Sequence, residues 1–454
     1  MICYSTSHVR SLTDRNSTSP RRPSLLSPDF RLSLALSSIL FWHRLLYRFF
    51  ARLRNALRSN DATNFCQRNP WISRTLRSKL TPAFGASLAG FFLGVIPASQ
   101  TRVTIAIYTL TRALEFLYNS LELEGYLRLK PWWVGSWMIM PLACGQLLHA
   151  FIFDRDCFPN SIGDMVLNRS PAYIHSRPTT LSTTVTWPSR MDIIDSLAET
   201  SGLQWPALIP PILFPKYIQT PSSTRLSRTA PLTNEAHPAI KRLSCAILHP
   251  HDPSCVRTFL NYYLKAFPAM SRLFTLVYGV IALTRYEDFL EFPLKSVNAL
   301  TAKILRTSFF LTSAIGTIWS SSCLLQRLLS PKFMPTSRWL LSGFLAGAWA
   351  FVDRGAGRSN FMYSARLSLD SLWKVGKKRR WWKGVRGGDV WLFVASLCMI
   401  NVLFERRPMA VQGAAVRKAL GVFRAQGWVD CAADSEEDTA ELDSDTEASP
   451  EAEE

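Results

Sequence analysis

Long apolar stretches recur along the chain, separated by polar and basic segments. The clearest, residues 132–153, has 22 residues in which His149 and Cys144 are the only ionisable side chains. Residues 80–99 form a second stretch of 20 uncharged residues, and residues 307–325 a third of 19. Because about 20 apolar residues in a helix cross the roughly 30 Å of bilayer hydrocarbon, the pattern predicts membrane-spanning helices. Buried helices of a soluble protein are the alternative.

Three further stretches extend this pattern. Residues 258–283 place apolar side chains near helical spacing, with a kink predicted at Pro268. Residues 103–118 are apolar except for Arg112 and Glu115. This helix therefore either crosses the bilayer with those two groups facing the protein interior or lies in the interface. Residues 390–404 form the last apolar run. The predicted fold class is all-α, a polytopic helical membrane protein.

Two regions of the chain repeat one another in order. Leu88-Ala89-Gly90 is matched by Leu345-Ala346-Gly347, and each copy leads to a helix with an acid, Glu115 or Asp370, in one register. Each region then has a tryptophan pair, Trp132-Trp133 or Trp381-Trp382, followed by an apolar run. The run ends in a similar tripeptide, Phe153-Asp154-Arg155 or Phe404-Glu405-Arg406. The sequence therefore predicts an internal duplication of a three-helix unit, as is typical of carriers, pores and translocase-like scaffolds.

Small residues in both regions predict close helix packing. They are spaced four apart and so fall on one side of a helix: Ala86, Gly90 and Gly94 in the first region, Gly343 and Gly347 in the second. Helix backbones approach closely at such positions, which matters in lipid because no hydrophobic driving force holds helices together there. We expect the two units to pack through these faces.

Four charged residues within the repeats are candidates for function. Glu115 and Asp370 hold equivalent positions, and Arg112 and Arg366 precede them by three and four residues. Ionisable groups inside a membrane are costly unless they face a cavity or a partner. A pair within one helix, or a helix end at the water boundary, is the structural alternative.

A basic amphipathic helix is predicted near the start of the chain. Residues 31–58 contain no acid, and Arg44, Arg48 and Arg52 lie opposite an apolar face. Such a helix suits the surface of an anionic membrane. Its composition is also compatible with mitochondrial targeting, and a surface helix packed on the protein is the third possibility.

The remaining segments complete the predicted organisation. We expect a disordered N-terminus and a linker with little regular structure, apart from a short helix at 191–201, because that linker holds 11 of the 27 prolines. The ranges are 1–30 disordered N-terminus, 31–78 basic amphipathic region, 79–155 first membrane unit, 156–245 linker, 246–336 Cys/His-containing segment and membrane helices, 337–423 second membrane unit with a short helix at 414–423, and 424–454 acidic disordered tail.

Charge is distributed unevenly along the chain. Twelve of the 33 acidic residues lie from Asp430 onwards, where there is no Lys or Arg, so the rest carries 52 basic against 21 acidic residues. These basic residues flank apolar runs or line one helix face, as expected at lipid head groups. We therefore expect a lipid bilayer as partner rather than nucleic acid, with membrane proteins or a second copy of the chain as further partners.

The cysteines show no disulfide framework. Nine are scattered along the chain, which indicates a reducing compartment, and the polar first thirty residues predict no secretory leader. Cys245, His249, His251 and Cys255 set four potential metal ligands within eleven residues, but their spacing matches no common zinc module and makes them weak candidates. Nucleophile elbows, phosphate loops and dinucleotide fingerprints are absent from the sequence, so we expect neither an enzyme nor a cofactor.

The order of motifs in the second half resembles the transmembrane protein 135 family of animals and fungi. Leu345-Ala346-Gly347, Tyr363, residues 369–376 and residues 388–393 follow that family's order, and His249 with Pro253-Ser254-Cys255 resembles the start of its Cys-containing region. The resemblance covers residues 245–423, and 80–155 through the repeat. It implies an integral protein of peroxisomal or mitochondrial membranes, linked to lipid handling and organelle dynamics, with glycine-rich helices similar to those of import translocases.

These observations lead to one expected function and two alternatives. We expect a non-enzymatic scaffold or conduit in lipid homeostasis, in a peroxisomal or mitochondrial membrane. The first alternative is a solute or lipid carrier with a path between the two repeat units. The second is an interaction hub that uses the basic helix and the acidic tail to bind soluble partners.

Overall fold

The computed structural model is helical throughout the residues it describes. These are 27–59, 62–126, 131–175, 177, 186–209, 224–284, 286–355, 357–424, 427–428 and 430. They form 18 α-helices and several short 3-10 helices, and their only β feature is an antiparallel bridge between Ala207 and Arg242. The all-α prediction is therefore confirmed. The predictions for residues 1–26, for residues 210–223 of the linker and for the acidic residues from 431 onwards lie outside the described residues.

The chain divides into two compact units that cut across both predicted repeat regions. Unit 1 comprises Met1–Pro131 and Lys383–Glu454, and unit 2 comprises Trp132–Trp382. The last apolar helix of residues 79–155 therefore belongs to unit 2, and that of residues 337–406 belongs to unit 1.

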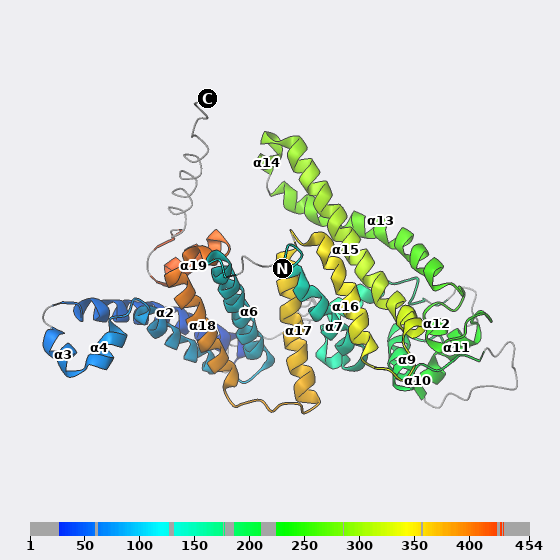
Figure 1. Ribbon diagram of the computed structural model, residues 1–454, viewed down its shortest axis with the longest axis horizontal. Coiled ribbons are helices and arrows are strands. Elements are labelled where there is room, and N and C mark those ends of the chain that lie inside the picture. The colour runs from blue at the N-terminus through cyan, green and yellow to red at the C-terminus, as the bar shows by residue number, and fades with distance from the viewer. Residues whose placement is uncertain are drawn as a thin grey trace, which may run out of the picture. The chain divides into compact units, whose positions relative to one another are not determined.

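Unit 1 is a helical bundle around a long C-terminal helix, α18. This helix packs against α5, η3 and α6, while α2 covers α5 and η3 from outside (Figure 1). Small core clusters fill these contacts, among them Ala35, Leu93, Ala106 and Phe393. Its elements are α2 Pro28–Ala56, α3 Thr63–Arg68, α4 Pro70–Leu76, α5 Thr81–Ser87, η3 Leu88–Val95, α6 Gln100–Leu123, α18 Gly388–Arg406, η7 Pro408–Ala410 and α19 Ala414–Phe423.

The start of α2 follows from local sequence signals. Ser27 is the N-cap and its hydroxyl accepts a hydrogen bond from the Phe30 amide at 3.3 Å, while Pro28 occupies the first turn, where its missing N–H costs nothing. Residues 28–30 are thus helical, and the predicted disordered N-terminus is too long by three residues. At the other end of the chain, Arg424 and Asp430 make buried ion pairs within unit 1, so the predicted tail also begins too early.

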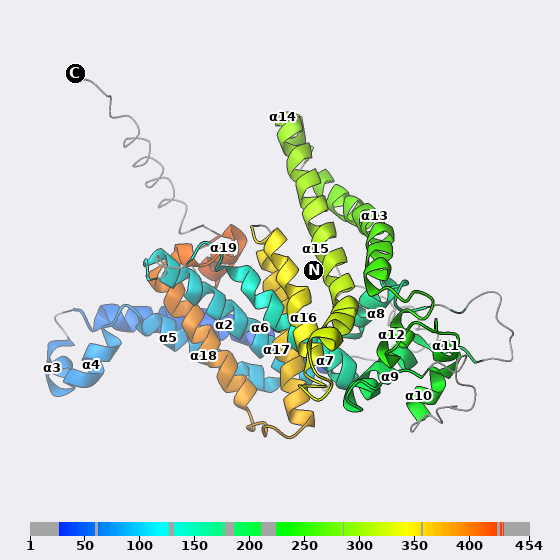
Figure 2. The same cartoon turned by 45° about the vertical axis from the view of Figure 1, so that its right-hand side comes forward.

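Unit 2 contains α7 packed against α16 and α17, and a long antiparallel pair, α13 and α15, with α14 at its tip (Figure 2). The N-cap of α13 is Ser254, whose hydroxyl accepts from the Arg257 amide. The elements are η4 Ser136–Met138, α7 Ile139–Phe153, η5 Arg155–Cys157, α8 Asn160–Asn168, α9 Arg190–Gly202, α10 Thr224–Arg228, α11 Ala230–Asn234, α12 Leu243–Leu248, α13 Cys255–Leu283, α14 Tyr286–Glu291, α15 Pro293–Leu328, α16 Arg338–Ala348, η6 Trp349–Asp353 and α17 Arg358–Lys378.

The predicted linker is instead a folded lobe of unit 2. Helices α8 to α12 lie within residues 156–245 or at their end, and the short helix predicted at 191–201 is α9. Ile193, Ile194 and Leu197 of α9 are fully buried in one cluster with Trp319 of α15. The prediction of little regular structure is wrong for the described part of this segment, because short helices form there and their apolar residues share one core with α13 and α15.

The apolar stretch 80–99 does not form one continuous α-helix. It is α-helical as α5, changes to a 3-10 helix at Leu88 and ends at Val95, two residues before Pro97. Gly90 and Gly94 favour the α-helix less than other residues do, and the residue before a proline avoids helical geometry. The same change occurs from α16 to η6.

Four described helices are long and apolar enough to cross a bilayer. They are Ser136–Phe153, Cys255–Leu283, Pro293–Leu328 and Gly388–Arg406, and Thr81–Val95 is a shorter apolar helix. These four correspond to apolar stretches found in the sequence, and they indicate a membrane protein. Residues 80–99 and 103–118 were further candidates from the pattern alone, because shorter and more charged helices also carry an apolar face.

Candidate metal centre

Four potential metal ligands meet inside unit 2. They are Cys245, His249, Cys255 and Cys323, and one ligand atom from each lies within 4.8 Å of all the others. Cys245, His249 and Cys323 are buried, and Cys255 is partly exposed. The side chains come from α12, from the loop after it, from the first residue of α13 and from α15.

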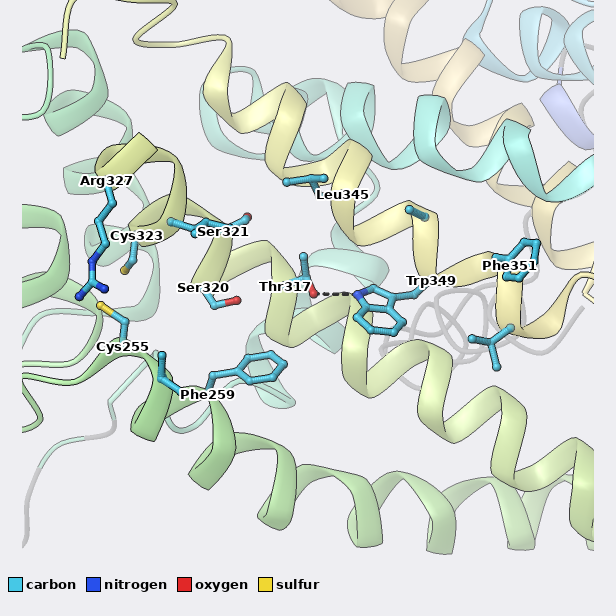
Figure 3. Close-up of a pocket in the computed structure, with 14 residues that line it drawn as sticks. Cys255, Phe259, Thr317, Ser320, Ser321, Cys323, Arg327, Leu345, Trp349 and Phe351 are labelled. Carbon is cyan, nitrogen blue, oxygen red and sulfur yellow. Dashed lines mark hydrogen bonds between the residues drawn. The ribbon is translucent and has the colours of Figure 1, made fainter. Parts of the chain in front are cut away.

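The distances within this cluster are those of non-bonded contacts. The Sγ atoms of Cys245 and Cys323 are 3.6 Å apart, and Sγ of Cys323 lies 3.6 Å from Nε2 of His249. A disulfide would require about 2.05 Å between the sulfurs. The thiol groups of Cys255 and Cys323 face one another across the space between α13 and α15 (Figure 3).

Backbone contacts fix the orientation of His249. Its Nδ1 lies 2.7 Å from the carbonyl oxygen of Asp252, so that nitrogen carries the proton and donates it to the carbonyl. Nε2 is therefore the ring nitrogen that faces the cysteines. The pair formed by Ser244 of α12 and Gln326 of α15, with hydrogen bonds of 2.7 and 2.9 Å, holds the two helices together beside the cluster.

The three thiol groups make the cluster favour positive charge. Burial lowers the pKa of His249, but hydrogen bonds with Cys245 and Cys255 outweigh it and raise the pKa to about 10. Cys255 also opens α13, where the partial positive charge of a helix N-terminus favours a thiolate.

The predicted ligand set is only partly the set that the fold assembles. His251 is exposed and its ring lies 5.9 Å from that of His175, while Cys323, 68 residues after Cys255, takes the fourth place. Pro250 separates the two histidines and turns the second away from the cluster. The local pattern found three of the four residues, and no local signal could identify the fourth.

An apolar pocket opens beside the cluster. Its volume is about 670 Å³, and Cys255, Cys323, Phe259, Leu345 and Trp349 are among the residues that line it (Figure 3). Trp349 is held in place by a hydrogen bond of 2.9 Å from its Nε1 to the Thr317 hydroxyl. Arg327 contributes a charged group to an otherwise largely apolar wall.

The small residues predicted for packing lie at helix contacts within each unit. A Cβ added to Gly343 would be 2.4 Å from the Cys144 carbonyl oxygen, and one added to Gly347 would be 2.5 Å from Cα of Pro141, both on α7. In unit 1, Gly90 faces Phe393 and Val394 of α18, Gly94 faces Val390, and Ala86 is fully buried. Each small-residue face therefore contacts the third helix of the other repeat region.

The charged residues of the repeats have partners on their own helices. Arg112 and Glu115 form an ion pair of 2.9 Å on α6, and the Glu115 side chain is almost completely buried. Asp370 pairs with Lys374 at 2.7 Å on α17. The predicted partner of Asp370 was Arg366, which lies on the same helix.

Other buried ion pairs were not predicted from the sequence. Arg102 of α6 binds Asp389 at the start of α18 through two hydrogen bonds, one of them 3.0 Å long. Arg424 binds Glu405 at 2.7 Å and donates to the Asn401 carbonyl. These contacts join residues separated by up to 287 positions, and short-range patterns do not contain them.

Comparison with protein-family models, with curated proteins and with solved structures gave no match for this chain.

Proposed function

We propose that this chain is a non-enzymatic integral membrane protein that acts as a scaffold or conduit in the lipid homeostasis or dynamics of a peroxisome or mitochondrion. The observation that carries the membrane part is the surface of α13. Only Thr258, Tyr262 and Met270 of its 29 residues are buried, although the helix is long and apolar.

The exposed side of α13 is suited to lipid rather than water. Its large exposed side chains include Leu264, Leu276, Val280 and Leu283, each at least 58% exposed. Contiguous apolar patches of this kind are rare on soluble monomers and mark membrane or protein contacts. Residues 266–283 contain a single charged group, Arg272, whose long side chain can reach the head-group region.

The proposal includes a duplicated three-helix unit with exchanged third helices. In its support, α7 packs on α16 and α17, while α18 packs on α5 with η3 and on α6. The first helix of each copy changes from α to 3-10, and each contacts the third helix of the other copy through Gly347 or Gly90. In such an exchange each copy is completed by a helix of the other, which suits a scaffold.

The outer face of α2 supports an additional contact with the membrane surface. Arg44, Arg48 and Arg52 are exposed beside a row of exposed apolar residues, Phe41, Leu45 and Phe49. The other side of α2 is covered by unit 1, where Trp42 stacks on Phe92. A basic and apolar face on a packed helix fits an anionic interface.

The organelle and the lipid role rest on the resemblance to the transmembrane protein 135 family. The local ion pairs of Glu115 and Asp370 favour a scaffold over a carrier, because each acid is satisfied on its own helix. A carrier would instead need such groups to face a common wet path.

A lipid carrier is the second candidate, and the apolar pocket favours it. About 670 Å³ with apolar walls and Arg327 suits an acyl chain near an anionic head group. Ser320→Trp, which fills the pocket, should reduce lipid that co-purifies with the protein. Val280→Trp on the exposed face of α13 is the matched control.

The main test is extraction and location of the tagged full-length protein. We expect it to remain in membranes at alkaline pH and to overlap peroxisomal or mitochondrial markers. Release by alkaline carbonate would contradict the integral membrane proposal, and a location in another membrane would contradict the organelle proposal. Normal lipid composition in cells lacking the protein would contradict the role in lipid homeostasis.

A further inference from the structure

We propose that Cys245, His249, Cys255 and Cys323 bind one Zn²⁺ ion in a closed tetrahedral site that fastens the α8–α12 lobe to the α13–α15 pair. The inference is independent of the proposed function, because a structural zinc site serves a scaffold and a carrier equally.

The ligand types select zinc. Three thiolates and one imidazole form one of the common tetrahedral zinc donor sets, and the soft sulfur ligands disfavour magnesium and calcium. All four positions of the tetrahedron are filled by protein, so no position is open for a reacting water. The site is therefore structural rather than catalytic.

The spacing of the ligand atoms fits the size of the ion. With Zn–S and Zn–N bonds of about 2.3 and 2.05 Å, the edges of a tetrahedron are about 3.8 Å between two sulfurs and about 3.6 Å between sulfur and nitrogen. The contacts of Cys323 with Cys245 and with His249 are each 3.6 Å. Two of the six edges therefore match the size of the ion, and all four ligand atoms lie within 4.8 Å of one another.

The surroundings prepare the ligands for the ion. The Asp252 carbonyl accepts the Nδ1 proton of His249, which leaves Nε2 as the ligand atom, as is usual for histidines that bind zinc. The backbone of α13 begins at Cys255, so its N-terminal amides stabilise the extra negative charge of three thiolates. On binding, the cluster releases three protons to solvent, so that three thiolates and a neutral His249 hold the ion.

The site lies where the lobe meets the α13–α15 pair. Cys245 belongs to the lobe, whereas Cys255 and Cys323 lie at the same end of the antiparallel helices α13 and α15. A four-ligand ion at that point fixes the lobe against both helices. Removing the ion should loosen α12 and the first turns of α13 without affecting unit 1.

The test begins with metal analysis of full-length protein purified in detergent under reducing conditions. We expect one zinc ion per chain, with three sulfur ligands at about 2.3 Å and one nitrogen ligand at about 2.0 Å in zinc X-ray absorption spectra. The proposal would be overturned if the protein contained no zinc, if iron or copper occupied the site instead, or if oxygen ligands dominated the spectrum. A disulfide between Cys245 and Cys323 in the purified protein would do the same.

Variants distinguish these ligands from other thiols. Cys245→Ser, Cys323→Ser and His249→Ala should each lose most of the bound zinc, whereas His251→Ala and Cys398→Ser should retain it. Zinc retained by the first three variants would refute the assignment. Because those variants can fail to fold, the spectrum of the unaltered protein decides the ligand set independently.

Hydrogen exchange tests whether the ion fastens the α8–α12 lobe to α13 and α15. Hydrogen exchange of the unaltered protein, before and after removal of zinc by a strong chelator, should show faster exchange in α12 and the start of α13, and no change in α5 and α6. Unchanged exchange in the lobe after complete loss of zinc would refute the fastening role.

Discussion

Helix α7 of unit 2 and helix α18 of unit 1 end on the same types of residue, Phe-Asp-Arg and Phe-Glu-Arg. The acid forms an ion pair in both units, but it is the buried partner in one unit and the more exposed partner in the other. In unit 2, Asp154 after α7 is buried with 6% of its side chain exposed, while its partners Arg379 and Lys378 are 34% and 45% exposed. In unit 1, Glu405 is 22% exposed and its partner Arg424 only 3%. The same sequence motif therefore leaves a buried acid in one unit and a buried base in the other.

The glycine contacts of the two units differ in a similar way. Gly343 and Gly347 meet the backbone of α7, which cannot move away without separating the helices. A Cβ added to Gly90 would lie 3.0 to 3.3 Å from side-chain atoms of Phe393 and Val394, and side chains can adjust. The corresponding positions of the two regions thus differ in tolerance, according to whether the neighbouring helix presents its backbone or its side chains.

The largest expected effect comes from bulk at the glycines of unit 2. Gly343→Ala and Gly347→Ala should each lower stability by about 2–3 kcal/mol, as overpacking does, whereas Gly90→Ala should cost less than about 1 kcal/mol. Leucine at either Gly90 or Gly347 should reduce the amount of folded protein. Thermal unfolding in detergent measures the difference, with Gly279→Ala, which faces open space, as control. Equal losses at Gly90 and Gly347 would contradict the distinction between backbone and side-chain contacts.

The ion pairs of Asp154 and Glu405, at the ends of α7 and α18, provide the second comparison. Glu405→Gln leaves the buried guanidinium of Arg424 without this counter-charge, and we expect a loss of about 2 kcal/mol, less than for a fully buried pair because Glu405 is 22% exposed. Asp154→Asn removes the buried charge itself and leaves two cations that can reach water, so we expect a loss of about 1–2 kcal/mol. The free energies of unfolding of the two variants should differ in this order. The reverse order would show that burial of the remaining partner does not decide the cost.

A pH effect is expected in unit 1, where His43 of α2 contacts Asn401 of α18 at 3.2 Å and the Phe423 carbonyl at 3.4 Å. Burial, and to a lesser extent the charge of Arg424, hold the pKa of His43 below its ordinary value of 6.5. Above pH 6.5 the ring is neutral in both states, so its contribution to stability is complete. As the pH falls below 6.5, the unfolded chain takes up the proton first, and stability should fall by at most about 1.4 kcal/mol per pH unit.

The measurement is unfolding of the protein and of His43→Gln between pH 7.5 and 5.5. The variant should be less sensitive to acid than the unaltered protein. Identical pH profiles would show that His43 does not contribute to acid sensitivity.

The smallest effect is expected from the paired acids of the repeats. Glu115→Gln together with Asp370→Asn should change stability by about 1 kcal/mol or less, since Arg112 and Lys374 remain about one-third exposed and can be solvated. If the proposed lipid role holds, the variant, at normal amount and location, should restore the lipid composition of cells lacking the protein, as the unaltered protein does. Failure to restore it would favour the carrier over the scaffold.

Features set by neighbouring residues could be read from the sequence. The apolar stretches that became α7, α13, α15 and α18 were predicted because length and composition decide whether a helix can cross a bilayer. The helix at Arg190–Gly202 was also predicted, and its start is fixed by a capping box between Ser189 and Asp192. The lobe around it was missed, because proline content does not reveal which apolar residues share a core.

The sequence by itself determined the helical class, the candidate spans, the basic face of α2 and the small-residue faces at 86–94 and 343–347. Each of these depends on residues within one helix. Only the tertiary structure decided that Cys323 joins Cys245, His249 and Cys255, that α7 packs with α16 and α17 while α18 packs with α5 and α6, and which partner of each ion pair is buried. These outcomes depend on contacts between residues far apart in the chain, whose free energies are set by burial and packing after folding.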